Sequence, residues 1–152
     1  MIGILSDAHG NRPAFDLAIN VLKRNGAEKF VFLGDAVGYL PTPSVLSSIQ
    51  NLGETISCIR GNHEDILLTG HFDPVREPLY QHAVTRRQMN EAQLLLIKAW
   101  PAQAALEFAA GTVLFLHGSP QDPTYGYVYP DTDLADPPRS WHRAPREGCD
   151  RS

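Results

Sequence analysis

The sequence predicts an α/β fold built on a parallel sheet, because short apolar runs alternate with helical patterns. Three apolar runs of strand length, residues 2–6, 29–33 and 54–59, each end at a polar turn. A helical pattern lies between the first two runs, and another lies at residues 44–52. Right-handed crossovers then place the carboxyl ends of all three strands at one edge of the sheet.

Local signals support the first predicted helix. Asn11 can cap its N-terminus, and Pro13 is tolerated in a first turn, where no backbone donor is needed. Gly26 is the residue type that commonly ends a helix. The apolar residues between them recur at helical spacing; they are Phe15, Ala18, Ile19 and Leu22.

The second part of the chain predicts helices followed by a hairpin. Residues 77–100 carry a long helical pattern that Pro101 stops. Because residues 85–91 in its middle are polar, one kinked helix and two shorter helices fit the pattern equally well. Apolar runs at residues 105–109 and 112–116 then predict a β-hairpin.

The composition changes after Pro130. Leu134 and Trp141 are the only large apolar residues of the segment 131–152, which is otherwise rich in proline and charge. We therefore expect residues 1–130 to form one domain and residues 131–152 to be a mobile or non-native tail.

The overall composition excludes several classes of function. The chain has a formal net charge of −4 and its 13 lysines and arginines are scattered, so we expect no strong nucleic-acid binding. No apolar run approaches the roughly 18 residues of a membrane span, so we expect no membrane association. Cys58 and Cys149 form no disulfide or zinc pattern, which favours a reducing compartment and a cytoplasmic location.

Four polar clusters each follow a predicted strand: Asp7-Ala8-His9, Gly34-Asp35, Gly61-Asn62-His63-Glu64 and His117-Gly118. Ligands of open α/β sheets bind at the carboxyl ends of the strands. Carboxylate, imidazole and amide oxygen together suit divalent metals. Each cluster alone is also typical of a turn or a helix cap, but all four in this order favour a metal site.

These strings resemble the calcineurin-like metallophosphoesterase superfamily, most closely its bacterial and archaeal phosphodiesterase branch. The resemblance rests on Asp7-Ala8-His9-Gly10-Asn11, Gly34-Asp35-Ala36-Val37-Gly38-Tyr39, Arg60-Gly61-Asn62-His63-Glu64 and His117-Gly118-Ser119-Pro120. It implies a four-layer αββα fold and hydrolysis of a phosphodiester or a small phosphate ester. Two divalent metals would share a hydroxide that attacks phosphorus in line. Manganese is the expected ion, with iron, zinc, nickel or magnesium as alternatives.

The resemblance also implies a role for each residue. Asp7 and His9 would bind one metal, Asn62 and His117 the other, and Asp35 would bridge the two. A carboxylate suits the bridging position because it has two anionic oxygens. His63 is similar to the residue that protonates the leaving oxygen.

The sequence departs from the family pattern in two places. Protein Ser/Thr phosphatases carry an Asp-Arg pair where this chain has Gly38 and Tyr39, so we expect a different phosphate ester as substrate. The late Gly-His-x-His motif is absent, and His142 lies in the predicted tail. We therefore expect a truncated or frame-shifted chain that lacks the C-terminal strands of the second sheet. The apolar surface left exposed could support self-association.

Alternative interpretations stay open. The chain could be a non-catalytic scaffold or an inactive fragment; a Rossmann-type nucleotide binder is disfavoured because no Gly-x-Gly-x-x-Gly turn follows the first strand. His71 and His82 are expected on surface turns or helix faces. Tyr39 fits a cleft-lining role and an ordinary packing role equally.

Overall fold

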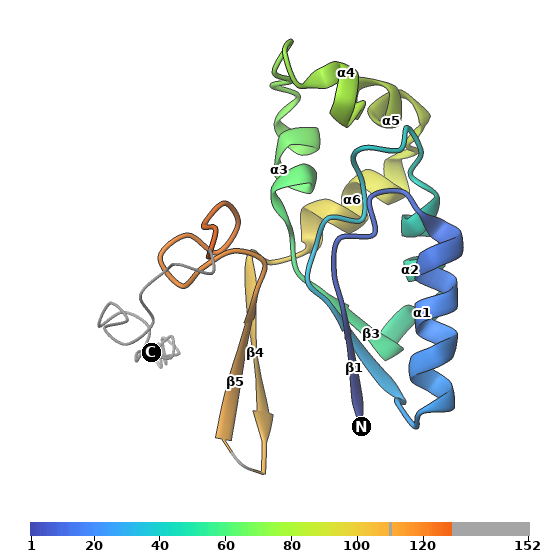
Figure 1. Ribbon diagram of the computed structural model, residues 1–152, viewed down its shortest axis with the longest axis vertical. Helices are drawn as coiled ribbons and strands as arrows, with labels where there is room; N and C mark the ends of the chain where they lie inside the picture. Colours follow the sequence, from blue (N-terminus) through green and yellow to red (C-terminus); the bar gives the residue numbers. More distant parts are fainter. Residues whose placement is uncertain (110, 129–152) are drawn as a thin grey trace, which may run out of the picture.

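The computed structural model describes residues 1–109 and 111–128. Its first part alternates strands and helices, and the three strands form a parallel sheet in the order β1-β2-β3 (Figure 1). The predicted α/β fold is therefore confirmed. The elements are β1 (Ile2–Leu5), α1 (Arg12–Arg24), β2 (Lys29–Phe32), α2 (Ser44–Leu52), the 3-10 turn η1 (Gly53–Thr55) and β3 (Ile56–Cys58).

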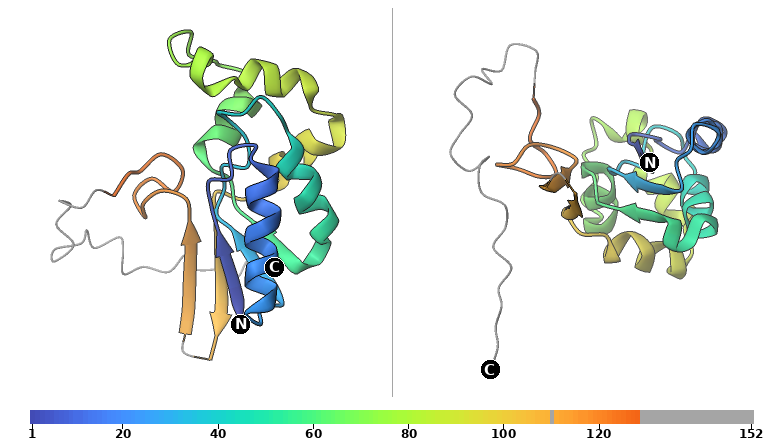
Figure 2. Two further views of the ribbon diagram at one scale, coloured as in Figure 1. Left: turned by 45° about the vertical axis from the view of Figure 1, so that its right-hand side comes forward. Right: turned by 90° about the horizontal axis from the view of Figure 1, so that it is seen from below.

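Four helices and an antiparallel hairpin follow within the described residues. The hairpin lies to one side of the parallel sheet, and its second strand runs back toward the edge where the sheet strands end (Figures 1 and 2). The elements are α3 (Asn62–Thr69), α4 (Glu77–Tyr80), α5 (His82–Gln88), α6 (Glu91–Ala99), β4 (Gln103–Phe108) and β5 (Gly111–Leu116).

The ends of α1 follow the signals in the sequence. The Asn11 side chain accepts a hydrogen bond from the backbone N–H of Ala14 at 3.2 Å. Beyond the helix, Gly26 has a φ of 89° and donates to the carbonyl of Lys23 at 3.0 Å. The predicted helix at residues 44–52 has the bounds of α2.

Residues 77–100 form three helices, so the expectation of one kinked or two shorter helices is wrong. Gln81 has a left-handed φ of 53°, which ends α4 before α5 begins. Asn90 then starts α6 with a capping box, in which Asn90 and Gln93 bond each other's backbone N–H at 2.9 and 3.2 Å. The Asn-x-x-Gln spacing is visible in the sequence, whereas nothing local marks Gln81.

The core lies between the parallel sheet and the helices. Phe32 of β2 is fully buried, and its ring centroid lies 5.7 Å from that of Phe15 and 6.3 Å from that of Trp100. Gly3 lets α1 approach β1, because a Cβ there would collide with Leu22 and Phe30. The sheet therefore meets α1 closely and holds the strand ends in register.

Apolar side chains are exposed along the outer edge of the sheet and on the hairpin. Ile4 of β1 is 54% exposed and Leu17 of α1 is 60% exposed, and an open groove of about 540 Å³ lies between these two elements. Val113 of the hairpin is also exposed. Self-association through this surface stays a prediction.

Two other expectations concern the predicted tail and membrane-spanning helices. The predicted tail at residues 131–152, with Cys149 and His142, lies outside the described residues. Among the described helices, none combines the length and apolar character needed to cross a membrane.

Replacing Phe32 with alanine tests the placement of the core. Loss of a fully buried phenylalanine should lower the free energy of unfolding by about 3–5 kcal/mol, measured by urea denaturation. Phe108→Ala is the matched control, because Phe108 is 37% exposed at the end of β4. Equal losses from the two substitutions would contradict the core described here.

Candidate metal centre

All six predicted site residues lie at the edge where the parallel strands end. The loop after β1 supplies two of them, the loop after β2 one, the start of α3 two, and the loop after β5 one. Contacts below 4 Å join all six into one cluster. The residues are Asp7, His9, Asp35, Asn62, His63 and His117.

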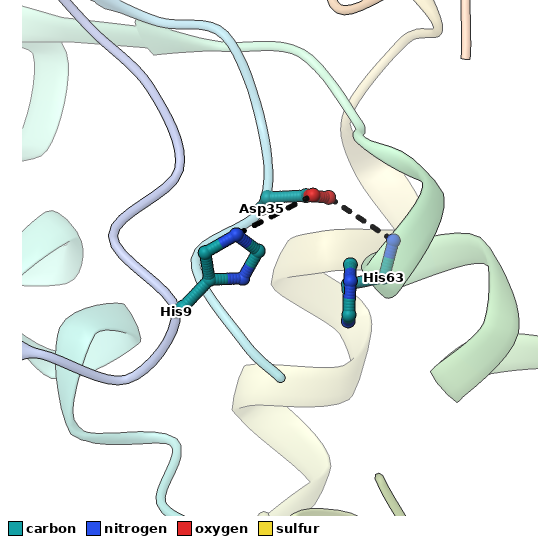
Figure 3. Close-up of side chains that lie close together, drawn as sticks. All are labelled: His9, Asp35 and His63. Carbon is teal, nitrogen blue, oxygen red and sulfur yellow. Dashed lines mark hydrogen bonds and ion pairs between the residues drawn. The ribbon is translucent and has the colours of Figure 1, made fainter. Parts of the chain in front are cut away.

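Asp35 is the centre of the cluster. Its Oδ2 lies 3.4 Å from Nε2 of His117 and 3.9 Å from Nε2 of His9. Its Oδ1 accepts a hydrogen bond of 3.0 Å from the backbone N–H of His63, so the carboxylate faces both the loop after β1 and the start of α3 (Figure 3). Asp35 is 3% exposed, and its charge therefore acts strongly on the neighbouring imidazoles.

Two groups of potential ligands share Asp35. One contains Asp35, His9 and His63, and the other contains Asp35, Asp7 and His117. Within each group the ligand atoms lie within 4.8 Å of one another. The amide Oδ1 of Asn62 lies 3.1 Å from Nε2 of His117 and so adjoins the second group. Asp35 occupies the shared position, and Asp7 also lies 3.5 Å from Nε2 of His9, so the division of the other residues between two metals stays a prediction.

Two histidines are oriented so that Nε2 faces the other potential ligands of the cluster. Nδ1 of His9 lies 3.1 Å from the carbonyl of Val37, and Nδ1 of His117 lies 2.8 Å from the carbonyl of Leu33. Because a carbonyl only accepts, Nδ1 carries the proton in each ring, and Nε2 is left to bind. Metal-binding histidines are typically held in this way. The donor set therefore fits a divalent metal.

The loops after β1 and β2 are joined through their backbones. Asp7 donates to the carbonyl of Gly34 at 3.0 Å, and His9 donates to that of Asp35 at 2.9 Å. Asp7, His9 and Asp35 all have positive φ angles, between 45° and 62°. Such conformations cluster at functional sites and persist where surrounding bonds hold them.

A buried glutamate fixes the loops after β2 and β3. Glu64 is fully buried, and its carboxylate accepts hydrogen bonds from the backbone N–H groups of Asp35, Ala36, Val37 and Gly61. The four distances run from 2.8 to 3.3 Å. Burial and the charge of Asp35 raise the pKa of Glu64 to about 7, against the effect of the backbone donors. A divalent cation beside Asp35 would offset that charge.

Glycine at the start of α3 lets Asp35 reach the helix N-terminus. Gly61 is the N-cap residue, and a Cβ there would collide with the Asp35 carboxylate. The carboxylate accepts from His63 at the second helical position, a bond that an N-cap side chain usually makes. Asp35 therefore caps α3 from another loop and places Asn62 and His63 beside itself.

A model of the calcineurin-like phosphoesterase family matches residues 1–147 of the chain. The chain belongs to the calcineurin-like phosphoesterases. Members of this family bind divalent metals, and the two ligand groups that share Asp35 are where this chain offers potential ligands for them.

Individual relatives agree with the family. The chain is 26% identical over 136 residues to an uncharacterized protein from Methanocaldococcus jannaschii, covering 86% of this chain and 55% of that protein. It is 29% identical to a metallophosphoesterase from Sphaerobacter thermophilus, with a TM-score of 0.62, covering 84% of this chain and 51% of that one. A hypothetical protein from Pyrococcus horikoshii OT3 shares the fold, with a TM-score of 0.69 at 24% identity, covering 93% and 63%. The chain thus spans about half the length of the curated relative it matches.

In the metal-free site, the pKa values of two proposed metal-binding histidines are raised. Burial lowers the pKa of His117, but the hydrogen bond to Asp35 and its charge outweigh burial and raise that pKa to about 9. For His9 the bonds to Asp7 and Val37 likewise outweigh burial and raise its pKa. The bond to His9 lowers the pKa of Asp7. These shifts show a strongly negative site, which a protonated imidazole neutralises in the absence of metal.

His63 has a different environment. Burial lowers its pKa to about 4, because the opposing effect of Asp35 is smaller and three other histidines surround it. Gly38 makes room for the ring, since a Cβ at that position would collide with it. Tyr39 packs at the outer side, with ring centroids 5.2 Å from His63 and 4.7 Å from His9. Tyr39 is 39% exposed, so it packs on the site and also faces solvent.

His82 is the site residue that the sequence interpretation missed. It was expected on a surface turn or helix face, but it is 1% exposed and its Nε2 lies 2.9 Å from Nδ1 of His63. The expected surface position is therefore wrong for His82, whereas His71 is exposed as expected. No motif marks His82, because its contact depends on how α5 packs beside α3.

Replacing Glu64 with glutamine tests the link between the loops. The glutamine amide would place its own N–H donors against backbone N–H groups that now donate to Glu64, so the free energy of unfolding should fall by about 1–3 kcal/mol. Urea denaturation of the metal-free protein measures this. Glu91→Gln, in the exposed first turn of α6, is the control and should change little. A Glu64 variant as stable as the control would contradict the linking role.

Proposed function

We propose that this chain is a metal-dependent phosphoesterase that hydrolyses a phosphodiester or a small phosphate ester. The observation that carries the proposal is the buried carboxylate of Asp35, which belongs to two groups of potential metal ligands at the carboxyl ends of the strands. One carboxylate shared by two ligand groups supports a two-metal site, the arrangement suited to displacement at phosphorus.

Five residues would hold the metals: Asp7, His9, Asp35, Asn62 and His117. When bound, two divalent ions would supply positive charge to the phosphate and lower the pKa of an attacking water. Mn²⁺ is our proposed ion, because carboxylate, imidazole and amide oxygen together suit it and no described thiol adjoins the site. The buried Asp35 and Glu64 keep the ligand loops in place without substrate.

His63 would act on the leaving oxygen. Its ring lies against His9, with centroids 4.9 Å apart, and so borders the five residues proposed to hold the metals. An anionic ester bound there adds negative charge beside the ring, which raises the pKa of His63 and favours a proton on it. A protonated imidazole at this position can give its proton to the departing oxygen.

The residues after Asp35 favour small esters over phosphoproteins. Gly38 and Tyr39 carry no cation that could grip a phosphate monoester dianion. The half-exposed ring of Tyr39 offers a flat apolar surface beside the two imidazoles. An ester with an aromatic or nucleoside-like group would pack on such a surface.

A non-catalytic scaffold is the second candidate. Exposed apolar side chains of β1, α1 and the hairpin support a binding role. The buried pair of His63 and His82 supports catalysis instead, because a scaffold needs no oriented imidazole beside an acidic cluster.

Replacing Asp35 with asparagine tests the proposed activity. The wild type with Mn²⁺ should hydrolyse bis(p-nitrophenyl) phosphate, and Asp35→Asn should lose at least about a hundredfold in kcat/KM, since it removes the shared anionic ligand. The release of nitrophenolate measures the rate.

Asp73→Asn is the control, because Asp73 is exposed and pairs only with nearby groups of its own turn. Equal turnover by the wild type and Asp35→Asn would contradict the assignment. Failure of the wild type to bind Mn²⁺ at millimolar concentration would favour the scaffold.

Metal binding should release a proton from His117. Its pKa of about 9 means that the metal-free ring is charged at neutral pH, so metal and proton compete for Nε2. Apparent Mn²⁺ affinity should therefore rise with pH up to about 9 and then level. Titration calorimetry in buffers of different ionisation enthalpy measures the protons released. The variant His117→Gln should release fewer protons, and an unchanged number would contradict the role of His117.

A further inference from the structure

We propose that His82 is a positioning residue for His63: it accepts a hydrogen bond from His63 Nδ1, and Glu77 in turn orients His82. The consequence is that His63 keeps its proton on Nδ1 and leaves Nε2 for the phosphate ester. This inference rests on the proposed function in that His63 acts on the leaving oxygen. It assigns two residues, His82 and Glu77, that lie outside the ligand cluster.

The contact between the two histidines is short and buried. Nδ1 of His63 lies 2.9 Å from Nε2 of His82, and the two residues are 3% and 1% exposed. Two neutral imidazoles at this distance share one proton, so one nitrogen must donate and the other must accept. The remaining partners of each ring decide which one donates.

Glu77 decides the direction of the bond. Its Oε2 lies 3.5 Å from Nδ1 of His82, and its carboxylate also accepts from the backbone N–H groups of His82 and Ala83 at 3.2 and 2.6 Å. Because a carboxylate favours a proton facing it, Nδ1 of His82 carries the proton and Nε2 accepts. His63 therefore donates through Nδ1.

Aromatic rings and a glycine surround His63 and His82. Phe72 stacks on His82 with centroids 5.9 Å apart and planes 11° apart. Tyr80 contacts both rings, with centroids 5.5 Å from His82 and 4.8 Å from His63. On the other side, a Cβ at position 38 would collide with the His63 ring, so glycine there lets the ring lie against the chain. These contacts hold the two imidazoles side by side.

The direction of the hydrogen bond between His63 and His82 can be measured by NMR, without an activity assay. Two-dimensional ¹H–¹⁵N spectra of the imidazoles in the metal-free protein at neutral pH distinguish a proton on Nδ1 from one on Nε2. The wild type should show His63 protonated on Nδ1. His82→Phe keeps a ring against Phe72 but has no acceptor, so His63 should shift toward the Nε2-protonated form. His82→Gln restores an acceptor and should retain the wild-type form.

The kinetic test compares leaving groups. If His63 must be oriented to protonate the leaving oxygen, the effect of His82→Phe should depend on the leaving group. The substitution should slow hydrolysis of a dialkyl phosphodiester at least about tenfold more than hydrolysis of bis(p-nitrophenyl) phosphate, whose leaving group needs little protonation. His82→Gln should recover part of the difference. His71→Phe, the same substitution at an exposed histidine, is the control and should match the wild type.

The outcomes separate this inference from the proposed function. Equal slowing of both esters by His82→Phe, or a wild-type His63 protonated on Nε2, would overturn the positioning role. A wild type that hydrolyses neither ester, yet shows His63 protonated on Nδ1, would overturn the proposed function while supporting the hydrogen bond. If His82→Phe loses activity selectively with the dialkyl ester and His82→Gln recovers it, the result would support both the positioning role and the proposed function.

Discussion

The carboxylate of Glu64 joins the loops after β2 and β3, which position Asp35, Asn62 and His63 of the candidate metal centre. Four backbone N–H groups, three from the loop after β2 and one from the loop after β3, converge on its two oxygens inside the protein. Backbone donors buried without acceptors cost free energy, so either loop moving alone would leave donors unpaired. The position of Asp35 relative to α3 is therefore set before any ligand binds.

This constraint passes outward from Glu64 in two directions. Asp35, held by its own backbone bond to Glu64, uses its carboxylate to cap α3 at His63 and faces His9 and His117 with the other oxygen. The loop after β1 is in turn bonded to the loop after β2 through its backbone. Three loops thus form one bonded unit, which explains how left-handed conformations persist at Asp7, His9 and Asp35.

Sequence patterns predicted the parallel sheet and the gathering of five of the six site residues, because a polar residue just after a strand of the sheet lies at its carboxyl edge. His117 follows the separate hairpin, so the packing of the hairpin brings it to that edge. The break at Gln81 has no such local cause, since its left-handed backbone is needed only for α5 to return toward α3. His82 is hidden for the same reason: a histidine at the start of a short helix is ordinarily exposed, and tertiary packing alone buries it. Glu64 was visible as a first-turn glutamate, but its bonds to another loop were not.

The two halves of the site differ in how they are supported. Asp35 and His9 stand on loops that backbone hydrogen bonds join directly, and the Asp35 side chain holds His63 of α3. His117 instead follows a hairpin that lies to one side of the sheet (Figure 1). His117 contacts the sheet loops through Leu33, Asp35 and Asn62, and the hairpin begins where Arg60 donates to the carbonyl of Pro101 at 2.8 Å. Charge at Asp35 is therefore also what draws the hairpin's histidine to the sheet. In the metal-free protein a proton on His117 supplies that attraction, so the group that competes with a metal also maintains the geometry that a metal would need.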